Sequence, residues 1–244
     1  MTSLALGQAL ARLHRDAAGL DAGLPEAFGE LPGIGELFAD DAELVEATAR
    51  LADAMSELPR GQDRWGVVHG DFELDSMAWE EGGPIAYDFD EAALSWYAAD
   101  IASAVRDLTD HTGLPATEHR ARFDVFLDGY RSVSPYDDQD LGRLPLFAGL
   151  HAAASLVRIT RALGEPARQE PEWLPELRDA LTDMARAHRR LAIDIGRNVG
   201  RGIRWRCSTA AATTVEALLE RSPRPASPPL PEPPGSWGEW RRSW

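Results

Sequence analysis

The chain has 244 residues, 44% of them hydrophobic, enough for one large domain or two small ones with a substantial core. Its 40 acidic and 25 basic residues give a formal net charge of −15, so we expect neither nucleic acid nor a membrane as a partner. With Cys207 as the single cysteine and no run of 18 uncharged apolar residues, we expect a cytoplasmic protein without disulfides, signal peptide or membrane span.

The N-terminal part of the chain predicts two amphipathic helices, over residues 3–18 and 41–58. In both, apolar side chains recur at steps of three and four, the spacing of one buried helical face. In the first helix these are Leu6, Leu10, Leu13 and Ala17. In the second they are Leu44, Thr48, Leu51, Met55 and Leu58. The stretch 19–35 between the helices is rich in Gly and Pro and predicts a connector.

Three short apolar runs then change the pattern from helix to strand. They are Gly66–Val68, Met77–Trp79 and Ile85–Tyr87. The sequence Glu80-Glu81-Gly82-Gly83 between the last two runs is typical of a turn. We therefore expect a small β element, including one hairpin, in an otherwise helical chain.

After residue 89 the helical period returns, with helices expected near 96–109, 117–131, 145–163 and 172–195. The expected apolar face of the last helix consists of Leu177, Leu181, Met184 and His188. Four large aromatic side chains are expected in the core or, as an alternative, in the wall of a substrate cleft: Trp79, Trp96, Tyr97 and Trp173.

The composition changes again at about residue 197. Residues 197–244 hold eight Arg and four Glu, and they include the Pro-rich run SPRPASPPLPEPPGS, which cannot bury enough apolar surface to order itself. We therefore divide the chain into a globular domain, 1–196, and a basic, disordered tail, 197–244.

The residues with chemical potential concentrate between positions 67 and 90. A strand leads to His69-Gly70-Asp71, and the following hairpin leads to Asp88-Phe89-Asp90. Carboxylates on neighbouring strand ends repel one another unless a cation lies among them, and hard oxygen ligands favour Mg²⁺ over zinc. Phosphoryl transfer needs one Asp for the acceptor hydroxyl, a second Asp for the metal ions and a further oxygen ligand five residues after the first. That position is Ser76.

These motifs resemble the HGD-x-x-x-x-N loop and the downstream D-x-D of the aminoglycoside phosphotransferase and choline kinase-like phosphotransferase family. The resemblance includes Trp96-Tyr97 and Asp100-Ile101-Ala102 and covers about residues 1–195. It implies an α+β, mostly helical fold: the C-terminal lobe of a protein-kinase-like structure, with a small β-hairpin as its catalytic element. It also implies phosphorylation of a small-molecule hydroxyl by ATP or GTP, with Mg²⁺ as the metal.

The resemblance assigns a role to each site residue. Asp71 matches the catalytic Asp, and Asp88 matches the metal-binding Asp. Asp90 matches the second acidic position, near the metal, and His69 matches the structural His that orients the loop. Ser76 stands where the family has a metal-ligating Asn, and a hydroxyl is a shorter and weaker Mg²⁺ ligand than an amide oxygen.

The absence of lysine is a second departure from the family pattern. All 25 basic residues are Arg, so the Lys that grips the nucleotide phosphates is missing. The early G-x-G sequence, Gly33-Ile34-Gly35, lies in no strand–loop–strand pattern. We therefore expect the nucleotide-binding N-terminal lobe to be absent and the activity of this chain to be impaired.

Other interpretations of the sequence stay open. One is a non-catalytic remnant that binds a small ligand or a protein, and another is a metal-dependent phosphate hydrolase, which no His cluster supports. A group of acidic residues either binds a cationic substrate or forms a solvated face. Its members are Asp124, Asp128, Asp137, Asp138 and Asp140.

Overall fold

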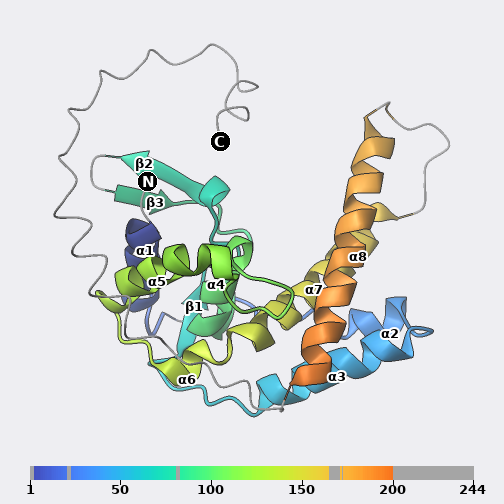
Figure 1. Cartoon of the computed structure of the whole chain (residues 1–244), viewed down its shortest axis with the longest axis horizontal. Coiled ribbons are helices and arrows are strands. Elements are labelled where there is room, and N and C mark those ends of the chain that lie inside the picture. The colour runs from blue at the N-terminus through green and yellow to red at the C-terminus, as the bar shows by residue number, and fades with distance from the viewer. Residues whose placement is uncertain (1–2, 21–22, 81–82, 165–170, 172, 200–244) are drawn as a thin grey trace. The chain divides into compact units, whose positions relative to one another are not determined.

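The computed structural model describes residues 3–20, 23–80, 83–164, 171 and 173–199 (Figure 1). The tail prediction falls almost wholly outside this part of the chain and stays a prediction. The longer helices are α1 (Ser3–Asp16), α3 (Ala42–Ser56), α4 (Tyr97–Ala104), α5 (Arg120–Arg131), α7 (Leu144–Leu163) and α8 (Leu174–Asn198). The shorter ones are α2 (Gly33–Leu37), α6 (Asp138–Leu141) and 3-10 turns at Leu74–Ser76, Arg106–Leu108 and Thr117–His119.

The predicted helices are confirmed within a few residues at each end. Helix α3 begins where the sequence indicates, because the side chain of Asp41 accepts a hydrogen bond from the backbone N–H of Leu44 and caps the helix. Leu10, Leu44 and Leu51, predicted on buried faces, are fully buried. Helix α2 begins at the end of the stretch 19–35 that was predicted as a connector and extends beyond it to Leu37.

The β structure consists of two separate antiparallel pairs. Strand β1 (Trp65–Val68) pairs with β4 (Ala93–Trp96), and β2 (Met77–Glu80) pairs with β3 (Gly83–Ala86). The three predicted strands are confirmed, but β4 was not predicted. Its four residues run directly into α4, so their conformation is decided by the long-range pairing with β1 rather than by a local pattern.

Helices α1 and α5 lie side by side because glycines let their backbones approach closely (Figure 1). A Cβ atom on Gly7 would lie 2.0 Å from the carbonyl oxygen of Phe126. A Cβ atom on Gly129 would lie 2.1 Å from the carbonyl oxygen of Leu4. No side chain fits at either position, so this contact fixes α1 against α5 and, with it, one wall of the core.

Helix α7 crosses the core and packs against α3, α4 and α8. By length and composition alone, the stretch Asp138–Leu163 could cross a membrane. In this protein its apolar side chains serve the core instead, because Phe147, Leu150 and Val157 are fully buried among the other helices.

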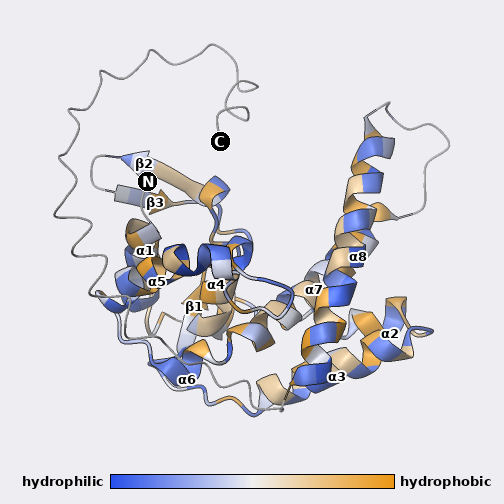
Figure 2. Ribbon diagram, viewed as in Figure 1, coloured by the Kyte–Doolittle hydropathy of each residue, from blue (hydrophilic) through white to orange (hydrophobic). Residues whose placement is uncertain are grey.

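The burial of α8 differs from the prediction. Leu177 and Met184, expected on its apolar face, are 42% and 49% exposed, and Trp173 is 63% exposed. The buried positions lie in its C-terminal part instead, where Ile193 and Ile195 join the core. Figure 2 shows polar and apolar residues interspersed along α8. Of the other aromatic residues expected in the core, Trp96 and Tyr97 are buried, whereas Trp79 is 42% exposed.

Candidate active site

The side chain of His69 connects the two motifs that the sequence singles out. Its Nε2 lies 3.0 Å from the carbonyl oxygen of Tyr87, the residue before Asp88. Its ring packs against Phe89, with 4.6 Å between the ring centroids, and against the edge of Phe72. Because a carbonyl only accepts, Nε2 is the protonated nitrogen of the ring. The buried His69 therefore holds the loop that carries Asp71 against the segment that carries Asp88.

The backbone of the same loop is held by a buried carboxylate on α4. Asp100 accepts hydrogen bonds from the amides of His69 (2.8 Å) and Gly70 (2.9 Å). It also lies 2.9 Å from Nε2 of His14 on α1, whose Nδ1 lies 2.7 Å from the hydroxyl of Tyr130 on α5. Three helices thus converge on the backbone that precedes Asp71.

The charge of Asp100 is stabilised although the side chain is fully buried. Burial by itself would raise the pKa of Asp100, but the hydrogen bond and charge of His14 and the two loop amides outweigh it, so the pKa is lowered. Asp100 therefore acts as a fixed anion that anchors the loop.

Gly70 has a backbone conformation that the loop requires. Its φ is +84°, in the left-handed region, and a Cβ atom there would lie 2.1 Å from the carbonyl oxygen of Glu91. Asp88 also has a positive φ, 64°, which Asp tolerates better than most residues. Both segments of the site thus turn sharply at the residues next to or at the predicted functional carboxylates.

The carboxylate of Asp71 is half-exposed and paired with an arginine. Nη1 of Arg106 lies 2.9 Å from Oδ1 of Asp71 and 3.3 Å from Oγ of Ser103. Nη2 of Arg106 pairs with Glu73. The acidic loop, residues 69–76, therefore has a counter-ion within the protein: Arg106, which lies in the turn that follows α4.

The predicted metal ligands are oxygen donors, the kind of ligand that Mg²⁺ takes. Asp88 and Asp90 are exposed, whereas Ser76 is buried in the turn Leu74–Ser76. Across the described residues there is no group of three or more His, Cys, Asp or Glu side chains that could hold a metal ion. This is compatible with Mg²⁺, which is commonly held by one or two carboxylates together with substrate phosphates and water. Asp88 and Asp90 fit that donor set.

Sequence reasoning missed part of the site. Asp100 appeared in the family resemblance, but its distance of about thirty residues from the loop gave no sign that it anchors the amides there. His14 is buried and links Asp100 to the hydroxyl of Tyr130, a contact that its place in a helical pattern did not indicate. For Arg106 the sequence carried no signal, because it follows a helix end without a motif.

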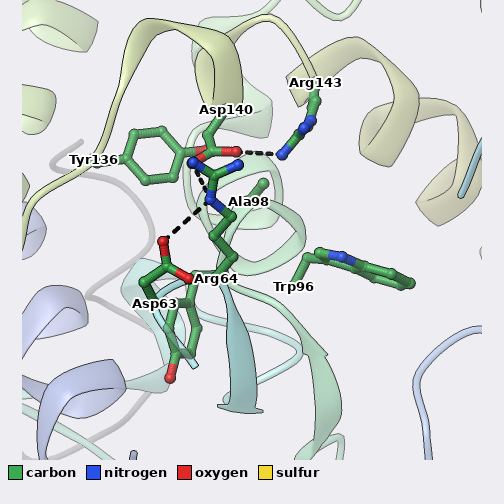
Figure 3. Close-up of a pocket in the computed structure, with 8 residues that line it drawn as sticks. Asp63, Arg64, Trp96, Ala98, Tyr136, Asp140 and Arg143 are labelled. Atoms are coloured by element: carbon green, nitrogen blue, oxygen red, sulfur yellow. Dashed lines mark hydrogen bonds and ion pairs between the residues drawn. The ribbon is translucent and has the colours of Figure 1, made fainter. Parts of the chain in front are cut away.

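A small, partly open pocket lies at a different place in the fold, next to Arg64 and Tyr136 (Figure 3). Its volume of about 10 Å³ is room for one water molecule. The Tyr136 hydroxyl is buried and has no hydrogen-bond partner within the described part of the chain, and burial raises its pKa. The Asp140 carboxylate beside it pairs with Arg143. Burial, together with the charge of Asp137, raises the pKa of Asp140 even so.

Most members of the acidic group expected near a cationic substrate are paired with arginines of the protein itself. Arg64 lies 3.0 Å from Asp137, and Arg131 and Arg120 pair in the same way with Asp138 and Asp124. These carboxylates already have cationic partners within the protein, so their pairing favours a structural role over the binding of a cationic substrate.

Comparison with known proteins places the N-terminal half in a defined family. The model of the phosphotransferase enzyme family (APH) matches residues 4–136. Amicoumacin kinase of Bacillus subtilis (strain 168) is 25% identical over 115 residues, 46% of this chain and 34% of that protein. The serine/threonine protein kinase RdoA of Salmonella typhimurium is 25% identical over 180 residues, 67% of this chain and 51% of that protein. The chain thus spans between a third and a half of the curated relatives it matches.

Two solved kinases share the fold. Amicoumacin kinase hAmiN, in complex with AMP-PNP, Ca²⁺ and Ami, aligns with a TM-score of 0.62 and 22% identity, covering 79% of this chain and 58% of that one. The microcompartment-associated aminopropanol kinase aligns with a TM-score of 0.57 and 18% identity, covering 80% and 61%. The predicted mostly helical, kinase-like fold is therefore confirmed.

Proposed function

Because this chain belongs to the phosphotransferase enzyme family, we propose that it carries the catalytic and metal-binding part of a small-molecule kinase. The reaction is transfer of the γ-phosphoryl group of ATP or GTP to a hydroxyl group. The acceptor oxygen forms a bond to the γ-phosphorus, the bond from that phosphorus to the nucleoside diphosphate breaks, and the hydroxyl proton passes to Asp71.

The observation that carries this proposal is the contact from His69 to the carbonyl of Tyr87. It brings the loop of Asp71 next to the segment of Asp88, although the two residues are 17 positions apart in the sequence. Phosphoryl transfer needs these two carboxylates at one place: one for the hydroxyl proton and one for the metal.

The residues that would hold Mg²⁺ are Asp88 and Asp90, with Ser76 as a weaker oxygen ligand. When bound there, the ion neutralises charge on the nucleotide phosphates. His69 and Asp100 act on the backbone and keep Asp71 and Asp88 in a fixed relation. Gly70 lets the loop turn where a side chain would collide with Glu91.

The acceptor is proposed to be a small molecule. The names of amicoumacin kinase and aminopropanol kinase support this class, and an amino alcohol is the first acceptor to test. RdoA is named as a protein kinase, so a Ser- or Thr-containing protein is the second class in the assay.

We expect the polypeptide of residues 1–244 to bind nucleotide weakly. It contains no lysine, so the phosphate-gripping Lys of this class of kinase has no counterpart in it. We expect residues 1–244 alone to be impaired in nucleotide binding and transfer. The assays therefore use the complete genomic reading frame that contains these residues.

The test is transfer of label from γ-³²P-ATP, and in parallel from GTP, to a panel of amino alcohols, aminoglycosides and proteins in the presence of Mg²⁺. The expected result is label in an acceptor, with one nucleoside diphosphate formed for each phosphoryl group transferred. If an acceptor binds, as measured by calorimetry, but neither label transfer nor nucleotide consumption follows, the protein is a non-catalytic binding module instead.

A further inference from the structure

Arg106 contacts two side chains of the acidic loop and one side chain of α4. Nη1 lies 2.9 Å from Oδ1 of Asp71 and 3.3 Å from Oγ of Ser103, and Nη2 pairs with Glu73. One guanidinium group thus bridges two carboxylates that stand two residues apart on the loop. Among the residues that the structure describes, it is the cation that forms ion pairs with residues 69–76.

Stability does not account for this arrangement. The side chains of Arg106, Asp71 and Glu73 are 42%, 43% and 34% exposed. Ion pairs at such exposure contribute about 0–1 kcal/mol each, because water screens the charges and two long side chains lose freedom. A bridge of this kind has a larger effect on orientation than on the free energy of unfolding.

The orientation it imposes concerns the two oxygens of the catalytic carboxylate. Oδ1 of Asp71 accepts from Arg106, whereas Oδ2 has no hydrogen bond to any residue in the described ranges. With Oδ1 held, Oδ2 is the oxygen left to face an acceptor hydroxyl.

Helix α4 and the turn that follows it therefore hold the loop by two kinds of contact. Asp100, within α4, binds the amides of His69 and Gly70. Arg106, in the turn after α4, binds the side chains of Asp71 and Glu73. The first contact fixes the backbone, and the second fixes the reacting carboxylate itself.

We propose that Arg106 is a positioning residue of the phosphotransferase reaction: its guanidinium holds Oδ1 of Asp71, so that Oδ2 receives the proton of the acceptor hydroxyl. This inference rests on the function proposed above. A planar guanidinium can bind two carboxylates at once with fixed geometry, whereas the ammonium group of Lys is a point charge. The positioning role therefore requires Arg and not merely a positive charge.

The test compares Arg106→Gln, Arg106→Lys and Arg158→Gln in the complete reading frame, with the acceptor found above or, failing one, with water as acceptor. Arg158 is the matched control, because its side chain is also 42% exposed and ion-paired, with Glu91 at 2.6 Å. We expect Arg106→Gln to lower kcat about 100-fold with little change in the KM for nucleotide, the effect of a misplaced reacting group. Arg106→Lys should stay at least about tenfold below wild type, since it keeps the charge but loses the fork. Arg158→Gln should stay within about twofold, as surface substitutions do.

Each outcome of these measurements supports or overturns the positioning role of Arg106. Full kcat in Arg106→Gln, or full rescue by Lys, overturns the positioning role. Equal losses in Arg106→Gln and Arg158→Gln also overturn it, since they indicate a general effect of surface charge. Asp71→Asn is measured alongside: if it keeps full activity, or if wild type transfers nothing even to water, the proposed function itself is wrong and the inference falls with it.

Discussion

At the scale of single residues, the candidate site depends on groups that hold the loop of Asp71, the proposed catalytic residue, rather than on its carboxylate alone. Asp100 anchors two amides of the loop, His69 ties the loop to the carbonyl of Tyr87, and Gly70 permits the turn. The family motif predicted His69, Asp71 and Asp88. It did not predict that Asp100 of α4 accepts hydrogen bonds from the amides of His69 and Gly70, because these residues are about thirty positions apart and meet only in the packed fold.

Replacing Asp100 by Asn should destabilise the protein in a pH-dependent way. The pKa of Asp100 is lowered in the folded state, so the stability it contributes is present above its ordinary pKa of about 3.9 and is lost as the pH falls through the lowered value. We expect a loss of about 3 kcal/mol at pH 7, typical of a broken buried pair. The difference from wild type should shrink below about pH 4. Urea unfolding at several pH values measures this, with the exposed Asp53→Asn as control. A pH-independent difference contradicts the assignment.

Replacing Gly70 by Ala, compared with the same change at Gly19, separates the cost of a left-handed backbone from the cost of a steric collision. Gly19 is the matched control, because its φ of +77° is also left-handed but a Cβ atom there meets nothing within 4 Å. We expect Gly19→Ala to cost about 1 kcal/mol, the penalty of the left-handed region alone. Gly70→Ala should cost at least about 2 kcal/mol more, since the backbone next to Glu91 must move. Thermal unfolding checks this, and similar losses in the two variants would show that the loop has room for a methyl group.

At the scale of elements, the fold is decided partly by local pattern and partly by contacts that the sequence does not reveal. The periodicity of α1, α3 and α7 was sufficient to predict them. Strand β4 and the exposure of α8 were not predictable in this way, because β4 is formed by pairing with β1, and the burial of α8 depends on which neighbours it has. Leu177 and Met184 follow a helical period but face solvent.

The close contact of α1 and α5 gives a prediction at this scale. Gly129→Ala should lower the free energy of unfolding by about 2 kcal/mol or more, because overpacking forces the two helices apart. Gly35→Ala in α2 is the control: a Cβ atom there meets nothing within 4 Å. Ala has the higher helix propensity, so stability should stay unchanged or rise by up to about 1 kcal/mol. Equal losses in both variants, measured by urea unfolding, would contradict the packing of α1 on α5.

At the scale of the whole molecule, the described part is a kinase-like, mostly helical body, and its candidate active site lies at the loop that follows β1, held by α4 and by the segment that follows the β2–β3 hairpin. The sequence was sufficient to predict this class, because the paired motifs are specific and their spacing survives in the fold. The predicted convergence of three carboxylates stays a prediction, since it depends on a nucleotide and a metal ion that bring their own oxygen ligands. The acceptor was not predictable, because it depends on the shape of the helical part and not on the motif.

The most direct measurement for the whole account is the rate of γ-phosphoryl transfer by Asp71→Asn, compared with wild type and with Asp53→Asn, which changes an exposed carboxylate of α3. Asn keeps the shape of the side chain but cannot take the acceptor proton, so we expect the rate to fall by about 10²–10⁴-fold, the range of general-base catalysis. Asp53→Asn should stay within about twofold of wild type, as expected for a surface residue outside the site. An Asp71→Asn protein that transfers phosphate at the wild-type rate would show that the loop around His69 is not the active site.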